Sequence, residues 1–130
     1  MLIKKDIPSA ICETKEEDHT LELLCVDICL DESNVRLFTA YTPGTEGSEE
    51  DAATMCRMTD AIESLMNTIH PVVIAADFNC RHVDWANYKC PATCHPKEKV
   101  LLEFCLSNDL QQMVPGPTRP ASGSLIDLVM

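Results

Sequence analysis

Alternating strand-like and helix-like segments predict a mixed α/β fold for this chain of 130 residues. Residues 21–30 and 35–41 are apolar and rich in β-branched or aromatic side chains, which favours two strands joined as an antiparallel hairpin. Residues 72–76 form a short, continuously apolar run, as expected for a buried strand. An apolar segment over residues 124–130 predicts a last strand. Two amphipathic helices complete the pattern, which is typical of a mixed sheet flanked by helices.

Both predicted helices have apolar residues at helical spacing. The first starts at Ser48, where acidic residues suit the positive end of a helix, and ends before Pro71. The second spans Lys97 to Ser107. After it, residues 111–114 predict a short strand, which leads into a Pro-rich loop at residues 115–120. The side chains expected to be buried are Met55, Met58, Ile62, Leu65, Met66 and Ile69 in the first helix, and Val100, Leu101, Phe104 and Cys105 in the second.

The composition is that of one folded domain with an uneven charge. Apolar residues make up 45% of the sequence, and its length allows one hydrophobic core but not two. The net charge of −11 opposes binding to nucleic acid through phosphate contacts. The acids are concentrated before Ser64, whereas the rest of the chain has five basic and six acidic residues. Any phosphate-handling surface is therefore predicted in the second half.

The sequence does not predict a membrane protein or a secreted protein. No apolar stretch approaches the roughly 20 residues of a membrane-spanning helix. The first residues, as far as Pro8, lack the apolar run of a signal peptide. An intracellular location is therefore expected, and with it reduced thiols for most of the eight cysteines.

An acid and an amide, Asp77 and Asn79, lie two positions apart just after the predicted strand at residues 72–76. Loops at strand ends are where α/β proteins place reacting groups, because the strand fixes the position and the loop stays open to substrate. A carboxylate there can bind a metal ion or accept a proton from water, and an amide can hold an anionic oxygen. The structural alternative is that both residues only form a turn, as Asx residues often do.

Several short motifs occur along the chain in a fixed order. They are Tyr41-Thr-Pro43, Asp77-Phe-Asn79, Val83-Asp-Trp85, Pro117-Thr-Arg119 and Leu125-Ile-Asp127-Leu-Val. Together they resemble the deoxyribonuclease-I-like endonuclease/exonuclease/phosphatase superfamily, in particular the endonucleases of non-LTR retrotransposons with their reverse transcriptases. The segment Leu2 to Pro8 is also similar to the strand and turn that precede the hairpin in this family. The resemblance therefore covers nearly the whole chain.

This resemblance implies a fold and a reaction. The fold would be part of a four-layer α/β sandwich with mixed, mostly antiparallel sheets, and the reaction would be DNA nicking that depends on Mg²⁺ or Mn²⁺. Asp77 would bind the metal ion and orient or deprotonate the attacking water, and Asn79 would hold a phosphoryl oxygen. Tyr41 would donate a hydrogen bond to the scissile phosphate. Asp127 would orient a catalytic histidine, and Thr118 would contact a phosphate.

The resemblance also implies partners and a context. DNA would be the substrate, the parent chain would carry a reverse transcriptase domain, and the protein would work in the nucleus without a membrane or a small-molecule cofactor. The early Asn and the metal-binding Glu of the family would lie before residue 1, and its Ser-Asp-His motif after Met130. The resemblance thus predicts a domain truncated at both ends and inactive by itself. Ala76 replaces a family glycine, which bears on how closely the backbone can approach the site. Trp85 is expected to pack in the core rather than to stack on a base.

Three other interpretations stay open. A catalytically inactive remnant would keep the fold without the activity. A phosphatase or sphingomyelinase-like member of the superfamily would share Asp-x-Asn, but it is not expected to combine Asp-Trp with Pro-Thr-Arg. A small zinc module could use ligand types that suit zinc, although their spacing matches no familiar pairing. Its ligands would come from Cys80, His82, Cys90, Cys94 and His95.

Thiol titration tests the interpretation of the cysteines. Titration of the denatured, unreduced protein should find most of the eight thiols free, because a reducing compartment does not sustain a disulfide framework. Metal analysis of the same preparation should find no stoichiometric zinc. One tightly held zinc ion per chain would instead favour the zinc module.

Overall fold

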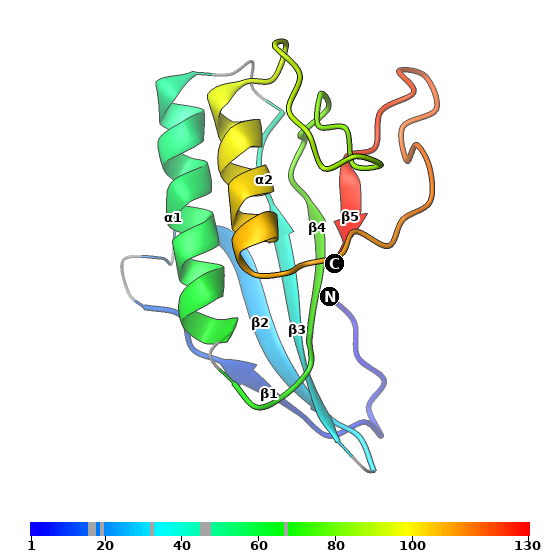
Figure 1. The fold of residues 1–130 in the computed structure, drawn as a ribbon. Coiled ribbons are helices and arrows are strands. Elements are labelled where there is room, and N and C mark those ends of the chain that lie inside the picture. The colour runs from blue at the N-terminus through cyan, green and yellow to red at the C-terminus, as the bar shows by residue number, and fades with distance from the viewer. Residues whose placement is uncertain (16–17, 19, 32, 45–47, 67) are drawn as a thin grey trace.

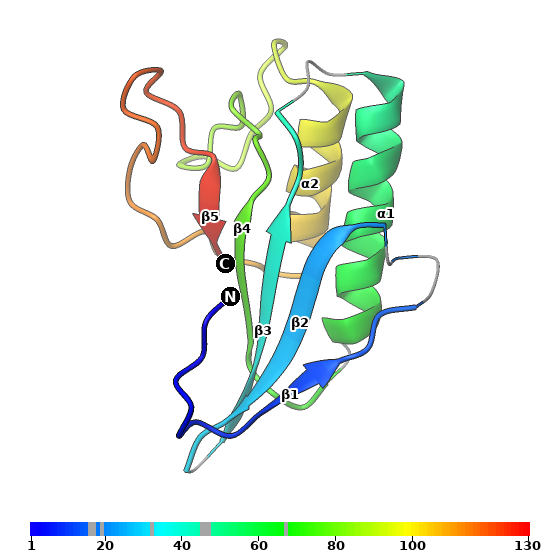
Figure 2. The ribbon, with the colours of Figure 1, turned by 180° about the vertical axis from the view of Figure 1, so that it is seen from behind.

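A computed structural model describes residues 1–15, 18, 20–31, 33–44, 48–66 and 68–130. In this part of the chain, one five-stranded sheet carries two helices on the same face (Figures 1 and 2). The mixed α/β class predicted from the sequence is confirmed. The strands are β1 (Ser9–Cys12), β2 (Glu22–Cys29), β3 (Asn34–Tyr41), β4 (Val72–Asp77) and β5 (Asp127–Val129), and the helices are α1 (Glu49–Met66) and α2 (Pro96–Ser107).

The strands follow the order β1-β2-β3-β4-β5 across the sheet. β2 and β3 form the predicted antiparallel hairpin, and β1 and β5 pair antiparallel with β2 and β4. β3 and β4 are parallel. Parallel neighbours need a long crossover connection, and α1 supplies it by crossing one face of the sheet. No helix among the described residues is long and apolar enough to cross a membrane.

The core lies between the sheet and the two helices. Phe38 of β3 and Ile74 of β4 are register partners with no solvent exposure, so both point toward the helices. Each Å² of apolar surface that these side chains remove from water contributes about 25 cal/mol. This burial is the main force that holds the sheet and the helices together. The helical spacing correctly predicted the residues that meet them, which are Met55, Met58 and Ile62 of α1 and Leu101, Phe104 and Cys105 of α2.

Helix α1 ends earlier than the predicted apolar stripe. Its last residue is Met66, and Ile69, which was predicted to be buried, is 96% exposed. The N–H of Thr68 donates to the carbonyl oxygen of Met66, which turns the chain out of the helix. Pro71 disfavours a helical conformation at the residue before it, and β4 begins directly after it at Val72.

The segment 111–114 is a loop and not the predicted strand. The Gln112 side chain satisfies the backbone of Val114, because Oε1 accepts from its N–H at 2.6 Å and Nε2 donates to its oxygen at 2.8 Å. The N–H of Gln112 donates to the Tyr88 hydroxyl. These side-chain contacts take the place of most of the backbone hydrogen bonds that a strand would form with a neighbouring strand. The last strand is shorter than predicted as well, because the Ser124 oxygen accepts from residues 118 and 119 instead of from β4.

The first strand lies after Pro8, whereas the resemblance placed a strand within residues 2–8. β1 is an edge strand with mostly exposed side chains, and Ile11 is 72% exposed. Such a strand has no buried face to produce an alternating apolar pattern, so the sequence did not predict it.

One ion pair connects two strands with the end of a helix. Arg36 of β3 donates from Nε and Nη2 to the two Asp27 carboxylate oxygens of β2, each at 2.7 Å, and from Nη1 to the Leu65 oxygen at 2.6 Å. Leu65 lies in the last turn of α1, where carbonyl oxygens have no partner within the helix. The hydrogen bonds from Arg36 lower the pKa of the Asp27 carboxyl below its ordinary value.

Replacing Arg36 by Met should lower the free energy of unfolding by about 1.5–3 kcal/mol, since it leaves a shielded carboxylate and a helix carbonyl without their charged partner. Because the pKa of Asp27 is lowered in the folded chain, this stability is present above the ordinary carboxyl pKa and is lost as the pH falls through the lowered value. Urea unfolding from pH 7 to pH 3 measures both effects. The matched control is Lys4→Met, which breaks a solvent-exposed ion pair with Asp6 and should change stability little. Equal losses for the two variants would contradict the assignment.

Candidate active site

The ends of three adjacent strands bring three predicted site residues into one row. Tyr41 of β3 is the register partner of Asp77 of β4, and Asp77 is the partner of Asp127 of β5. Register partners direct their side chains to the same face, and odd spacing from Phe38 and Ile74 places this row on the face away from the helices. The three side chains therefore share one edge of the sheet, and Tyr41 is 41% exposed there.

Asn79 is held beside this row by the loop that follows β3. Its backbone φ is 50°, in the left-handed region that Asn tolerates better than most residues. Its N–H donates to Asp77 Oδ1 at 3.0 Å, and its Nδ2 donates to the Thr42 oxygen at 2.9 Å. Thr42 is buried, and its hydroxyl donates to the Phe78 oxygen at 2.6 Å. The loops after β3 and β4 are thus joined in both directions.

The predicted Asx turn is present, because the Asp77 carboxylate accepts the N–H of Asn79. Among the described residues, no hydrogen bond takes Asp77 Oδ2 or Asn79 Oδ1. The turn therefore uses one carboxylate oxygen of Asp77 and leaves the side-chain oxygen of Asn79 available to other partners. A structural role and a chemical role are compatible at both positions.

Negative charge is crowded at the end of β4. Burial raises the pKa of the Asp77 carboxyl above its ordinary value, and the facing Asp127 carboxylate raises it further. The N–H of Asn79 and the cations Arg119 and Lys97 act in the opposite direction, but they do not reverse the shift. A bound cation would relieve this repulsion.

Thr118 organises the start of β5. Its Oγ1 accepts from the N–H groups of Ile126 and Asp127, at 3.2 and 3.1 Å. These contacts attach the Pro-rich loop to the strand that carries Asp127. The hydroxyl hydrogen of Thr118 is still free to donate to a ligand, since a hydroxyl has one donor as well as its acceptor positions.

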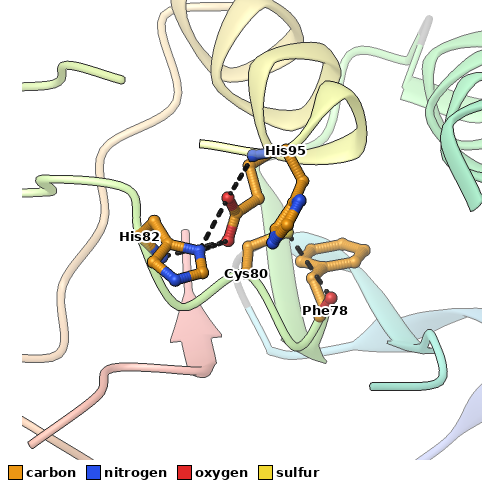
Figure 3. Close-up of polar contacts among 5 residues, drawn as sticks. Phe78, Cys80, His82 and His95 are labelled. Carbon is orange, nitrogen blue, oxygen red and sulfur yellow. Dashed lines mark hydrogen bonds and ion pairs between the residues drawn. The ribbon is translucent and has the colours of Figure 1, made fainter. Parts of the chain in front are cut away.

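Two charged residues at the start of α2 are buried beneath the site, and the sequence analysis did not single them out. Glu98 is 1% exposed and accepts from the N–H groups of His82 and His95, at 3.0 and 2.8 Å. The ring Nδ1 of His82 lies 3.1 Å from the same carboxylate, and Figure 3 shows these contacts converging on it. Burial acts to raise the pKa of Glu98, but these hydrogen bonds together lower it below its ordinary value.

Lys97 is 3% exposed, and its Nζ donates to the Pro43 oxygen at 3.1 Å. Helix α2 is therefore tied to the loops after β4 and β3, through Glu98 and Lys97 respectively. A sequence signal for this arrangement exists. Pro96 opens the helix, and Glu98 stands three residues after His95, which is the spacing of a capping box.

The geometry does not favour the zinc module. No three His, Cys, Asp or Glu side chains are grouped to hold a metal ion in the part of the chain that the structure describes. Burial raises the pKa of the Cys94 thiol to about 12 and raises that of Cys80 strongly, which opposes the thiolate that zinc needs. Cys80 lies against the Phe78 oxygen, and His82 is engaged by Glu98 (Figure 3).

Two further expectations concern packing. Trp85 is 8% exposed and meets Tyr88 edge to face, with ring centroids 6.0 Å apart, so its predicted packing role is confirmed. Ala76 is buried and pairs with Ala40 and Leu128 on the helix side of the sheet. The methyl group that replaces the family's glycine therefore points away from Asp77.

The mostly antiparallel five-stranded sheet with two helices on one face matches the deoxyribonuclease-I-like endonuclease fold. The structure is similar to the endonuclease domain of TRAS1, a telomere-specific non-LTR retrotransposon, with a TM-score of 0.60 and 12% identity, over 95% of this chain and 53% of that one. The sequence matches the endonuclease-reverse transcriptase family over residues 35–130. The chain belongs to this family, and it spans about half the length of the TRAS1 domain.

Two toxins give weaker structural matches. They are the Staphylococcus aureus beta toxin, with a TM-score of 0.43 and 15% identity over 78% of this chain and 34% of that one, and the Haemophilus ducreyi cytolethal distending toxin, with a TM-score of 0.42 and 17% identity over 93% and 42%. A search of curated protein sequences found no match.

Asp77→Asn should raise the free energy of unfolding at pH 7, because the neutral amide removes a crowded charge and keeps an oxygen for the N–H of Asn79. The raised pKa of Asp77 means that its contribution to stability is fully present below the ordinary carboxyl pKa and is lost as the pH rises through the raised value. The gain should therefore disappear below about pH 3.5, near the ordinary carboxyl pKa. Thermal unfolding in EDTA at both pH values measures it. Asp109→Asn, at an exposed position with φ 52°, is the control for general charge removal. A less stable Asp77→Asn protein at pH 7 would contradict the pKa assignment.

Proposed function

We propose that this chain is part of a DNA-nicking endonuclease domain whose reacting groups are centred on Asp77. The observation that carries the proposal is the row formed by Tyr41, Asp77 and Asp127, with Asn79 locked beside it. Carboxylate, amide and phenol groups converge at one edge of the sheet, as phosphodiester hydrolysis requires. Family membership supports the same conclusion, since residues 35–130 include all of these side chains.

Each of these side chains keeps a donor or acceptor atom that its contacts in the structure do not use, and that atom can act on a substrate. Asp77 accepts one N–H through Oδ1, so Oδ2 can orient the attacking water or take its proton. The Asn79 amide donates one of its two hydrogens to Thr42, and the other can donate to a phosphoryl oxygen. The exposed Tyr41 hydroxyl can donate to the scissile phosphate. Thr118 can donate to a phosphate, and Asp127 can orient an imidazole supplied by the rest of the domain.

The residues present fit a divalent metal ion. Asp77 and Asp127 offer hard oxygen donors, and their mutual repulsion is the condition that a cation relieves. Mg²⁺ and Mn²⁺ sites commonly use one or two carboxylates together with substrate phosphates. When bound, the ion would neutralise charge that develops on the phosphoryl oxygens. Asp77 would hold it from this chain, with the charge of Asp127 nearby, and a further carboxylate would come from elsewhere in the domain.

The proposed reaction also implies a substrate, a partner domain and a cellular location for the protein. DNA would be the substrate of the full domain, and a reverse transcriptase domain in the same parent chain would extend the nicked end. Such a protein would act in the nucleus. A catalytically inactive member of the family would have the same fold and the same row of residues, so only an activity measurement separates the two.

Asp77→Ala should lower the rate of plasmid nicking by orders of magnitude without unfolding the protein, because it removes a group that acts mainly in the transition state. The measurement uses this sequence extended to the length of the matched endonuclease domain, with supercoiled plasmid and Mg²⁺. Asp109→Asn is the control for loss of one negative charge and should nick normally. Nicking by Asp77→Ala within tenfold of the parent would contradict the assignment, and an extended parent that does not nick at all would favour an inactive remnant.

The 130-residue chain by itself should show no Mg²⁺-dependent nicking. Its described residues contain no group of three His, Cys, Asp or Glu side chains that could hold a metal ion, so this chain by itself would bind the ion weakly. Catalytic groups that act as a unit lose most of their effect when one is missing. Nicking by a monodisperse preparation that stops with EDTA or with Asp77→Ala would contradict this expectation.

A further inference from the structure

A cavity adjoins Asn79 on the side toward α2. It has a volume of about 250 Å³, and its walls include Gly44, Arg81, His82, His95 and Lys97. Two of these side chains end in basic groups, a guanidinium and an ammonium, and two are imidazoles. None of them belongs to the row of proposed reacting groups. The cavity is thus a separate, basic compartment that shares one wall, Asn79, with the candidate active site.

Lys97 is the most unusual group in this cavity. A lysine ammonium is almost never fully buried unless it is paired, because removing the charge from water costs more than one neutral hydrogen bond restores. Yet Lys97 is 3% exposed, and its one hydrogen-bond partner among the described residues is the neutral Pro43 oxygen. An ammonium has three donors, so two remain for a ligand. A buried ammonium group with two unused donors beside an open cavity favours an anion as the ligand of that cavity.

The carboxylate in the cavity wall does not meet this need. Glu98 already accepts from two backbone N–H groups and lies against the His82 ring. In Figure 3, dashed lines join the His82 ring and the His95 backbone nitrogen to the one unlabelled carboxylate, which is that of Glu98. Among the described residues, no carboxylate lies within ion-pair distance of Lys97 or Arg81, whose side chains are left to act on a bound molecule.

The position of Arg81 connects this cavity to the site. A Cβ placed on Gly44 would lie 3.1 Å from Asn79 Oδ1 and 3.5 Å from Arg81 Nη2. The amide of Asn79 and the guanidinium of Arg81 therefore border the same small opening, which a larger residue at position 44 would narrow. A strand of nucleic acid whose one phosphate lies at Asn79 can place its next phosphate beside Arg81 and Lys97.

We propose that the cavity between Arg81 and Lys97 binds the backbone phosphate next to the scissile phosphate of the DNA substrate. This inference rests on the proposed function, because it takes Asn79 as the boundary between the two phosphates. Two cations in a partly enclosed cavity explain how a chain with a net charge of −11 can hold a polyanion locally. Phosphate contacts of this kind position the strand without reading its sequence.

The test is the salt dependence of duplex binding by the full chain in EDTA, measured by fluorescence anisotropy. Arg81→Gln and Lys97→Met should each weaken binding and reduce the slope of log K against log salt by about 1, the value for one lost phosphate contact. Lys99→Met is the matched control, because Lys99 is exposed on the same helix and should leave the slope unchanged. Lys97→Arg should restore most of the slope. Unchanged slopes in Arg81→Gln and Lys97→Met, or no measurable duplex binding by the unmodified chain, would overturn the proposal.

Two controls keep the outcome decisive. Arg81 is exposed and forms no ion pair among the described residues, so Arg81→Gln carries the test even where Lys97→Met fails to fold by circular dichroism. Inorganic phosphate that shifts the amide resonances of the cavity, while both variants keep the parent slope with DNA, would mean a site for free anions and would overturn the assignment to a nucleic-acid strand.

Asp77→Ala separates this inference from the proposed function. Normal slopes in Arg81→Gln and Lys97→Met, with nicking lost in extended Asp77→Ala, would reject the phosphate site and keep the nuclease. Reduced slopes, with nicking unaffected by Asp77→Ala, would keep the phosphate site and reject the catalytic assignment.

Discussion

Parallel pairing of β3 with β4 is the constraint on which the rest of the structure depends. Because the two strands run in the same direction, α1 must cross one face of the sheet, and its apolar side then covers Phe38 and Ile74. The carboxyl ends of both strands also lie on the same side of the sheet. Tyr41 and Asp77 become register partners there, and the loops that follow can join through Thr42 and Asn79. Antiparallel pairing of the same two strands would place these residues at opposite edges and leave no common site.

Local patterns were sufficient for most of this architecture. The hairpin, both helices and the buried strand before Asp77 follow from apolar periodicity and from acids or prolines at element ends, since these signals come from residues a few positions apart. The same logic failed where polar contacts between near neighbours satisfied the backbone. Gln112 takes the hydrogen bonds of a predicted strand, and the chain turns after Met66, so that Ile69 leaves the predicted stripe. The spacing of apolar residues gives no information about such contacts.

The candidate site shows the same division. Asp77 and Asn79 stood out because a polar pair after an apolar run is a local signal, and ordered motifs added Tyr41 and Asp127. Lys97 and Glu98 did not stand out, because a charged pair in the first turn of a helix is ordinary on a surface. Their importance lies in burial, which depends on the loops at Pro43 and His82 closing over the helix start. Those loops are 54 and 16 residues away in sequence.

Under the proposed function, the charges of the site would serve ligand binding rather than stability. At the end of β4, Asp77 faces Asp127, and burial together with this neighbouring carboxylate raises the pKa of Asp77. A short distance away, the Lys97 ammonium is buried with only a carbonyl oxygen as its partner. A direct Lys97–Asp77 ion pair would relieve both costs, yet the structure forms none between them. A metal ion at the carboxylates and a phosphate at the cation would satisfy both charges at once, and a DNA strand with its divalent counterions provides that combination. The unrelieved charges of the free protein would therefore suit the proposed function, because a site whose charges were already paired would have to break those pairs before it could bind.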